Sequence, residues 1–183
     1  MARGQQFLLA AEYADANSAF RAALSRNPNY YGALLGLAET LIAQGEFSEV
    51  QALLDRASAL REESVEILLL RAELALGEAR LRDAIVHITS ARQRDPDAAE
   101  PWFLQARADL ATGQENRALG SLQQAISRAP EHRPSLLARA LIGSETGNPR
   151  TQQWLDTARS IWPDHPDTHR VAALVQVRSG NLE

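Results

Sequence analysis

The residues best suited to metal chemistry are His165 and His169, which lie four positions apart. On a helix this spacing would place both imidazoles on one face, where they could hold a metal ion. However, Pro166 favours the first turn of a helix, so His165 falls at or before the helix cap, and no third ligand lies nearby in the sequence. We therefore interpret both as solvated residues at a helix end and predict no metal site. The isolated His87 and His132 have the same interpretation.

The sequence gives no support for a catalytic site either. The chain has no cysteine, and all 19 of its basic residues are arginine, which excludes thiolate catalysis, cysteine-bound zinc, disulfides and lysine Schiff bases. Neighbouring carboxylates such as Glu62 and Glu63 are most simply solvated charges, and Gly113 and Gly147 are spaced as turn residues rather than as a phosphate loop. No serine, histidine and aspartate recur at positions that would share one cleft. We therefore predict no enzymatic activity and no cofactor.

Composition and charge exclude further classes of partner. The formal net charge is −4 and no block of like charge stands out, so the sequence carries no nucleic-acid or acidic-membrane footprint. The longest apolar runs, such as 67–70, are far shorter than the roughly 20 residues of a membrane-spanning helix, and no signal peptide is visible. The abrupt ends, including a Leu182-Glu183 pair that resembles a cloning scar, lead us to expect a fragment whose targeting segment is absent or was removed. The sequence is compatible with a location in the cytoplasm or in the periplasm.

The elements that position these residues follow from an internal repeat. Four residue types recur after 34 positions: Ala84, Ile88, Ala91 and Pro96 return as Ala118, Leu122, Ala125 and Pro130. Earlier copies of the same pattern are Ala16, Phe20, Ala23 and Pro28, and then Val50, Leu54, Ala57 and Glu62. The last copy is Thr151, Leu155, Ala158 and Pro163, displaced by 33. One displacement for several residue types is the mark of a helical repeat array, and the shorter last step indicates one lost residue near Asn148 and Pro149.

A second set of columns divides each repeat in two. Small residues recur at Gly4, Ala38, Ala72, Ala106, Ala140 and Ala173, behind bulky residues at Leu34, Leu68, Trp102 and Leu136. A turn column, rich in glycine as left-handed helix ends prefer, follows at Ala11, Gly45, Ala79, Gly113, Gly147 and Gly180. The apolar spacing between these columns is helical throughout. We predict helical hairpins with first helices near 1–10, 31–44, 65–77, 99–112, 133–146 and 166–179, and second helices near 14–26, 48–60, 82–94, 116–128 and 149–160.

These columns resemble the signature of the tetratricopeptide repeat (TPR) family over essentially the whole chain, with residues 99–129 as the closest copy. The resemblance implies an all-α, right-handed superhelical solenoid of antiparallel helix pairs, a generic bacterial-type array of about five and a half repeats and eleven helices. Its repeats would span 1–30, 31–64, 65–98, 99–132 and 133–165, followed by a lone first helix over 166–183, all in one domain. Two departures predict looser packing in the third to fifth repeats: a polar column at Arg71, Gln105 and Arg139, and Asp109 and Gly143 in place of a family tyrosine.

The same resemblance implies that the first helices form an inner wall that binds an extended peptide or a partner helix. The repeat period puts two apolar columns there, Leu35, Leu69, Phe103 and Leu137, and Leu8, Ile42, Leu76 and Leu110. Between them runs a polar column of Gln5, Glu39, Glu73 and Arg107. An apolar strip open to solvent marks a partner site, whereas the alternative is that close packing buries these leucines. The lysine and asparagine clamp with which one branch of the family holds a C-terminal carboxylate is contradicted, because these positions carry Leu, Phe, Glu and Arg.

The function that follows is a non-enzymatic scaffold that binds a protein or peptide in its groove, with Phe103 as the anchor. The alternative is a regulatory or substrate-recruiting arm of a larger enzyme, such as a glycosyltransferase, or of a bacterial envelope or polysaccharide-export component. Trp154 and Trp162 are interpreted as packing residues rather than as a ligand platform. The last helix has no partner helix, which would expose Val171, Leu174 or Val175 and favour self-association, as in a homodimer.

Overall fold

The structure, a computed structural model, describes residues 12–62 and 64–179. The regular structure in these ranges is α-helical and forms a solenoid of helix pairs, as the repeat columns predict. The first predicted helix, over 1–10, lies outside the described residues. Within the described ranges, no helix combines the length and the apolar character that crossing a membrane requires.

The chain divides into two compact units, Met1–Pro96 and Asp97–Glu183. The first contains α2 (Tyr13–Arg26), α3 (Tyr31–Gln44), α4 (Val50–Leu60), α5 (Val65–Gly77) and α6 (Leu81–Arg94). The second contains α7 (Glu100–Ala111), α8 (Glu115–Arg128), α9 (Arg133–Thr146), α10 (Thr151–Ile161) and α11 (Pro166–Ser179). These ends lie within two residues of the predicted ones. The unit boundary lies close to a predicted junction between repeats, and a single array over 1–183 stays a prediction.

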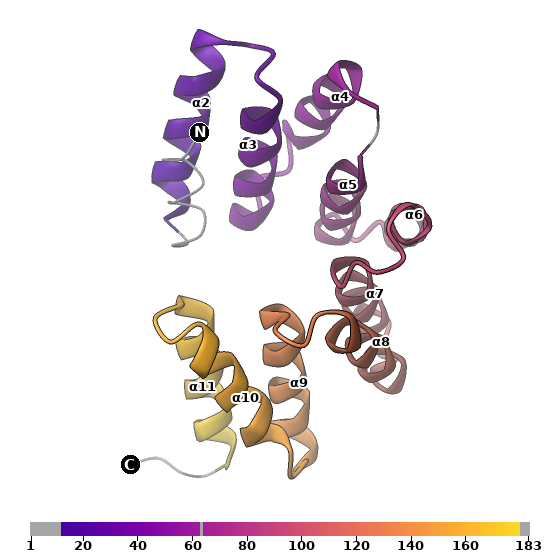
Figure 1. Cartoon of the computed structure of the whole chain (residues 1–183), viewed down its shortest axis with the longest axis vertical. Helices are drawn as coiled ribbons and strands as arrows, with labels where there is room; N and C mark the ends of the chain where they lie inside the picture. Colours follow the sequence, from indigo (N-terminus) through magenta and orange to yellow (C-terminus); the bar gives the residue numbers. More distant parts are fainter. Residues whose placement is uncertain (1–11, 63, 180–183) are drawn as a thin grey trace. The chain divides into compact units, whose positions relative to one another are not determined.

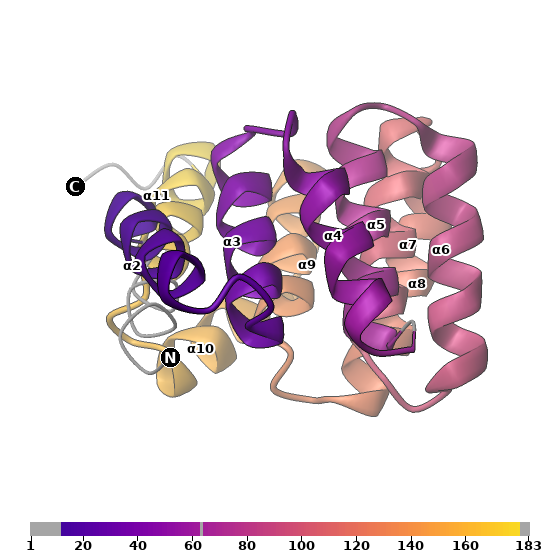
Figure 2. The same ribbon diagram turned by 90° about the horizontal axis from the view of Figure 1, so that it is seen from above.

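Helices that follow one another along the chain pack side by side within each unit. In the first unit, α3 lies between α2 and α4 (Figures 1 and 2) and also contacts α5, the first helix of the next pair. In the second unit, α9 contacts α8, α10 and α11. In each unit, therefore, two first helices of neighbouring pairs contact one another, α3 with α5 and α9 with α11.

Small residues let the two helices of a pair approach closely. The alanines that carry the repeat on α6 and α8 are 0% exposed: Ala84, Ala91, Ala118 and Ala125. The small residues of the first helices are buried at Ala38, Ala72, Ala106 and Ala140, whereas Ala173 on α11 is exposed. Ala106 and Ala118 share one buried cluster with Leu122, which fills the space beside them. The burial of these eight alanines confirms the predicted register from α3 to α9, and the exposed Ala173 is the exception.

The first helices end in left-handed turns at the predicted turn column. The backbone angle φ is 75° at Gly45, 58° at Ala79, 71° at Gly113 and 66° at Gly147. In all four turns the next amide donates to the carbonyl five residues before it: Glu46 to Leu41, Arg80 to Ala75, Gln114 to Asp109 and Asn148 to Gly143. This is the bond that closes a Schellman motif. Glycine adopts such a φ without strain, whereas Ala79 adopts it at a conformational cost.

The one-residue deletion in the last repeat falls after Asn148. The hydrogen bond from the Asn148 amide to Gly143 keeps the 34-residue register of the earlier turns. Asn148 then shapes the turn, because its Oδ1 accepts from the Arg150 amide at 2.9 Å and its carbonyl accepts from the Thr151 hydroxyl at 2.7 Å. Helix α10 begins only at Thr151, so Pro149 lies in the turn and not at the first helical position, where we expected it.

The polar column does not loosen the packing at its two arginines. The guanidinium of Arg71 donates to Asp55 Oδ1 at 3.1 Å and to Ser58 Oγ at 3.2 Å, both on α4 of the preceding pair. Arg139 repeats the contact two periods later by donating to Gln123 on α8. In both cases the partner lies 16 residues before the arginine. The arginines thus link a first helix to the preceding pair.

The position of the family tyrosine is also well packed, in contrast to the prediction. Asp109 is 5% exposed, and its Oδ2 accepts from Ser121 Oγ at 3.2 Å across the hairpin. In the next pair, Gly143 makes room for Trp154, since a methyl group added to Gly143 would lie 3.0 Å from the indole ring. Trp154 and Trp162 both pack against the buried cluster of the last helices, which confirms their interpretation as packing residues.

Helix α11 exposes only part of the predicted apolar set. Val171 and Val175 are 3% and 5% exposed, because α11 packs against α9 and α10. The expectation that either valine is exposed is therefore wrong. Leu174 is 43% exposed and Val177 is 56% exposed. Self-association through this exposed side of α11 stays a prediction.

Candidate binding groove

A groove in the second unit is lined by three first helices. Its volume is about 310 Å³. Helix α7 contributes Phe103 and Arg107. Helix α9 contributes Arg133, Pro134, Leu137, Ala138 and Leu141, and α11 contributes Asp167, Arg170 and Val171. All ten residues belong to the unit Asp97–Glu183, so the groove lies within one compact body.

The floor of the groove is apolar. Leu137 and Val171 are 5% and 3% exposed and form part of the hydrophobic core beneath the groove. Phe103 is partly exposed and packs against the neighbouring cluster that contains Ala106 and Leu122. An aromatic ring that is anchored in a core but still accessible offers a large apolar contact area. The floor is therefore suited to an apolar side chain of a partner.

His132 packs against Phe103 and does not line the groove. The two rings meet edge to face, with centroids 5.7 Å apart and planes at 65°. One ring nitrogen of His132, Nε2, lies 2.7 Å from Glu100 Oε2 on α7, and the other, Nδ1, lies 2.8 Å from Ser135 Oγ on α9. The side chain is 14% exposed. The interpretation of His132 as a solvated residue is therefore wrong.

Serine, histidine and a carboxylate in a row also occur in catalytic triads, but here their burial decides the role. Ser135 is 0% exposed, so its hydroxyl is not accessible to a substrate. His132 is the cap residue of α9, and the contact to Ser135 is local to that first turn. The trio thus ties the start of α7 to the start of α9. Glu100 and His132 are 32 residues apart, so this contact joins neighbouring helix pairs.

The rim of the groove is rich in arginine. Three arginines and one aspartate line it, which gives a local formal charge of +2 (three minus one). Arg170 Nη2 lies 2.9 Å from Asp167 Oδ1, and the guanidinium of Arg133 lies over the ring of Trp162 at 5.5 Å. Arg107 is exposed and has no ion pair or hydrogen bond from its side chain to any residue that the structure describes. The groove is therefore basic, although the whole chain has a net charge of −4.

The two histidines at the start of α11 lie in different environments. His165 precedes the helix, its side chain is 13% exposed, and its Nδ1 accepts from the Asp167 amide at 3.1 Å. Burial and the nearby Arg133 lower the pKa of this histidine. His165 is thus a helix cap rather than the solvated residue we expected, whereas His169 is exposed. No group of three metal-ligating side chains occurs among the described residues.

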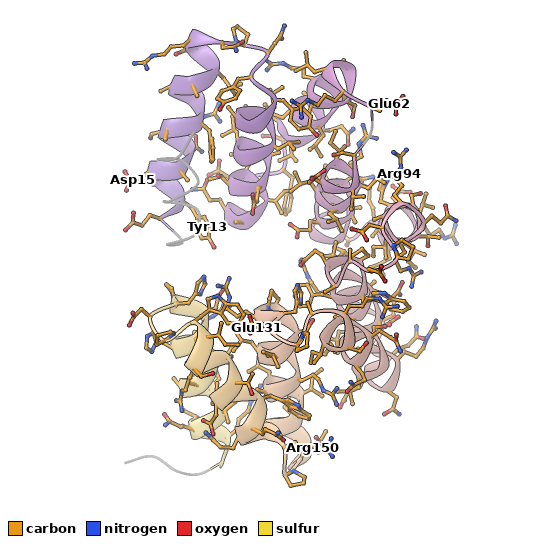
Figure 3. The ribbon with its side chains drawn as sticks, viewed as in Figure 1. Tyr13, Asp15, Glu62, Arg94, Glu131 and Arg150 are labelled. Atoms are coloured by element: carbon orange, nitrogen blue, oxygen red, sulfur yellow. The ribbon has the colours of Figure 1, made fainter. Side chains whose placement is uncertain are left out.

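The exposed carboxylates Glu62 and Glu131, near helix ends, do not line the groove. Glu62 is exposed between α4 and α5, and its side chain projects away from the helices (Figure 3). Its neighbour Glu63 lies outside the described residues. Glu131, in the turn before α9, is exposed as well (Figure 3).

The repeat itself is identified by comparison with known proteins. The family model of the tetratricopeptide repeat matches residues 7–74. These residues belong to the tetratricopeptide repeat family. No curated protein sequence matches the chain.

Solved TPR structures extend the fold over nearly the whole chain. A thermophilic TPR protein from Thermus thermophilus has a TM-score of 0.78 at 20% identity, with 94% of this chain and 95% of that chain covered. The APC/C hetero-tetramer Cut9–Hcn1 has the same TM-score of 0.78 at 14% identity, over 97% of this chain and 34% of that chain. YrrB, described as a TPR protein with an unusual peptide-binding site, has a TM-score of 0.53 at 16% identity, over 93% and 89%. Such likeness shows the TPR fold.

The TPR period brings together three of the predicted groove residues. Phe103, Arg107 and Leu137 all line the groove of the second unit. Leu110, further along α7, is 40% exposed and does not line it. For these residues the inner columns, read from the sequence, correspond to one surface of the molecule.

The other six predicted residues lie on α3 and α5 of the first unit: Leu35, Glu39, Ile42, Leu69, Glu73 and Leu76. Leu35 and Ile42 are only partly exposed and pack against the hydrophobic core of that unit. Glu39 is exposed. Burial by packing therefore accounts for part of the apolar columns in the first unit. A binding role for these six residues stays a prediction.

Sequence reasoning missed the arginines contributed by α9 and α11. Arg170 lies 33 residues after Leu137, which is the shortened last step of this TPR array. It therefore continues the column that contains Phe103 and Leu137. Extending that column by one more step would have found Arg170. It would also have shown that the column changes from apolar residues to a basic one.

Proposed function

We propose that the second unit of this TPR protein binds a peptide or helix of a partner protein in its groove, without catalysis. The observation that carries this proposal is the partly exposed Phe103 above a buried apolar floor, within a groove lined by three first helices. A volume of about 310 Å³ lies at the lower end of the roughly 300–1,000 Å³ typical of ligand pockets. It suits one or two side chains of a partner.

The chemistry of the groove supports recognition rather than reaction. Its apolar residues offer contact area, and its arginines offer charge-assisted hydrogen bonds. Ser135 and His132, which could take part in nucleophilic catalysis, do not line the groove and are hydrogen-bonded to each other. The described fold of YrrB, which carries a peptide-binding site, adds a precedent for peptide binding on this fold.

Phe103 should contribute most of the binding energy. Aromatic residues in the centre of an interface act as hot spots, and their truncation costs at least about 2 kcal/mol, or roughly 30-fold in affinity. The test is a titration with peptides selected on the whole chain from a random display library. We expect Phe103→Ala to weaken binding by at least about 30-fold.

Trp102 provides a matched control. It lies next to Phe103 on α7 and is also partly exposed, but it does not line the groove and instead stacks under the guanidinium of Arg128 at 4.7 Å. Trp102→Ala and the first-unit variant Arg92→Ala should leave affinity unchanged, and circular dichroism should show that all variants are folded. If the control variants weaken binding while Phe103→Ala does not, the groove is not the site.

A further inference from the structure

The groove arginines differ in how far their charge is already satisfied. Arg170 is 72% exposed and is paired with Asp167, whose side chain is 44% exposed. Arg107 is exposed on the opposite wall, and among the described residues its side chain has no ion pair or hydrogen bond. An arginine without a partner at the edge of an apolar groove is available to a ligand. Because a guanidinium presents several donors in a fixed fork, a carboxylate is a well-matched acceptor.

The apolar and basic groups are arranged in order across the groove. Phe103 and Arg107 are four residues apart on α7 and so share one face of that helix. Leu137 of α9 forms the floor, and Arg170 of α11 stands on the other side. A ligand whose apolar side chain rests on Phe103 and Leu137 therefore has an arginine on either side of it.

Building on the proposed function, we propose that the natural ligand is an acidic peptide segment, in which carboxylate side chains flank an apolar anchor. The anchor occupies the floor at Phe103 and Leu137, and the carboxylates pair with Arg107 and Arg170. The local charge of +2 is opposite in sign to the chain's net charge of −4, so the groove attracts acidic groups that the net charge of the chain repels. Such complementarity governs register and partner choice.

A polyanion without apolar side chains fits this surface less well. The floor would stay uncovered, and the net negative charge of the chain would repel the rest of a nucleic acid. A peptide satisfies both halves of the groove at once. The proposal therefore commits to a protein ligand that carries aspartate or glutamate.

The experiment starts from random peptides displayed on phage and selected on the whole chain, with Phe103→Ala protein as the counter-selection. We expect the recovered peptides to combine an apolar residue with carboxylates on both sides. A synthetic recovered peptide and its amide analogue, in which Gln and Asn replace Glu and Asp, are then compared by fluorescence anisotropy. The amide analogue should bind about tenfold more weakly, and the affinity of the acidic peptide alone should fall as salt is raised.

Arginine variants then locate the contact. Arg107→Gln and Arg170→Gln should each weaken the acidic peptide about threefold, the size of one exposed ion pair, and leave the amide analogue unaffected. Arg117→Gln is the matched control, because Arg117 is exposed on α8 of the same unit and does not line the groove.

Each outcome separates the inference from the proposed function. If the peptides depend on Phe103 but bind equally well as amides, the groove binds peptides and the acidic ligand is wrong. If a phosphoserine version binds more than tenfold better than the glutamate peptide, the carboxylate assignment is overturned in favour of phosphate. If no recovered peptide depends on Phe103, the proposed function fails, and this inference fails with it.

Discussion

The backbone of Ala79 adopts a strained, left-handed conformation. Among the described residues it alone combines a side chain with a positive φ, 58°, at the position that Gly45, Gly113 and Gly147 occupy in other repeats. The left-handed conformation costs an L-residue roughly 1–2 kcal/mol. Glycine removes that cost but adds about 0.5–1 kcal/mol of chain entropy to the unfolded state. Ala79→Gly should therefore raise the free energy of unfolding by about 0.5–1 kcal/mol.

The measurement is urea unfolding followed by circular dichroism at a helical band. With a slope of about 2 kcal/mol/M, the gain corresponds to a rise of about 0.3–0.5 M in the midpoint. Gly45→Ala is the reverse experiment in the same unit, because Gly45 has φ 75° and a methyl group added there would meet no atom within 4 Å. It should lower the midpoint by a similar amount, because alanine there must adopt the left-handed φ that glycine tolerates. A lower midpoint for Ala79→Gly, at unchanged helical signal, would refute the reasoning.

Three further predictions test packing and protonation. Ala118→Leu should lower the free energy of unfolding by about 1–3 kcal/mol in urea titrations, because Ala118 is 0% exposed and the larger side chain overpacks the hairpin. Gly143→Ala should lower the free energy of unfolding by a similar amount, about 1–3 kcal/mol, since its methyl group would lie 2.5 Å from the Thr151 hydroxyl. Gly120→Ala, whose methyl group meets no atom within 4 Å, should instead raise it by about 0.5–1 kcal/mol. Burial lowers the pKa of His165, so the unfolded chain binds more protons and stability should fall as pH drops below about 6.5. His165→Asn, which keeps a cap acceptor, should reduce this loss in unfolding curves compared between about pH 7 and pH 5.

The helices and the buried alanines could be predicted because they depend on one property that every repeat shares. A residue such as Ala118 must be small wherever two helices touch, so the same type returns with the period and the register can be read from it. The turn column is predictable for the same reason, since a left-handed φ selects glycine at Gly45, Gly113 and Gly147. The agreement of helix ends follows from these shared constraints.

The contacts of His132 could not be predicted, because they occur in one repeat only. Its partners are Glu100, Ser135 and Phe103, and no equivalent set of four recurs along the chain. Periodicity places His132 at the start of a helix but does not say whether its ring faces solvent or a neighbouring helix. That depends on which side chains the adjacent repeat happens to offer, and here they are an acidic residue and an aromatic ring.

Departures from the repeat also fall in pairs across the hairpin. Asp109 meets Ser121, and in the next repeat the equivalent positions carry Gly143 and Trp154. The polar pair Asp109 and Ser121 is replaced by the smallest residue, Gly143, and the largest, Trp154. The space between the two helices is therefore filled in both repeats. The Trp154 ring then stacks with the guanidinium of Arg139, 4.4 Å from its centroid, which accommodates a cation in a column that is usually apolar. The unusual residues Asp109 and Gly143, considered without their partners on the second helix, therefore gave a wrong prediction of loose packing.

The same logic explains where binding specificity can arise in such a chain. The hairpin backbone repeats, so each first helix presents its inner positions in the same way, and only the side chains differ from one repeat to the next. Along one inner column they change from Leu137 to Arg170 over the last step, beside Phe103 on the preceding helix. A groove with an aromatic floor and basic walls thus arises where the repeat pattern breaks. Because the buried alanines hold the backbone in place, such changes alter what the surface binds without altering the fold that presents it.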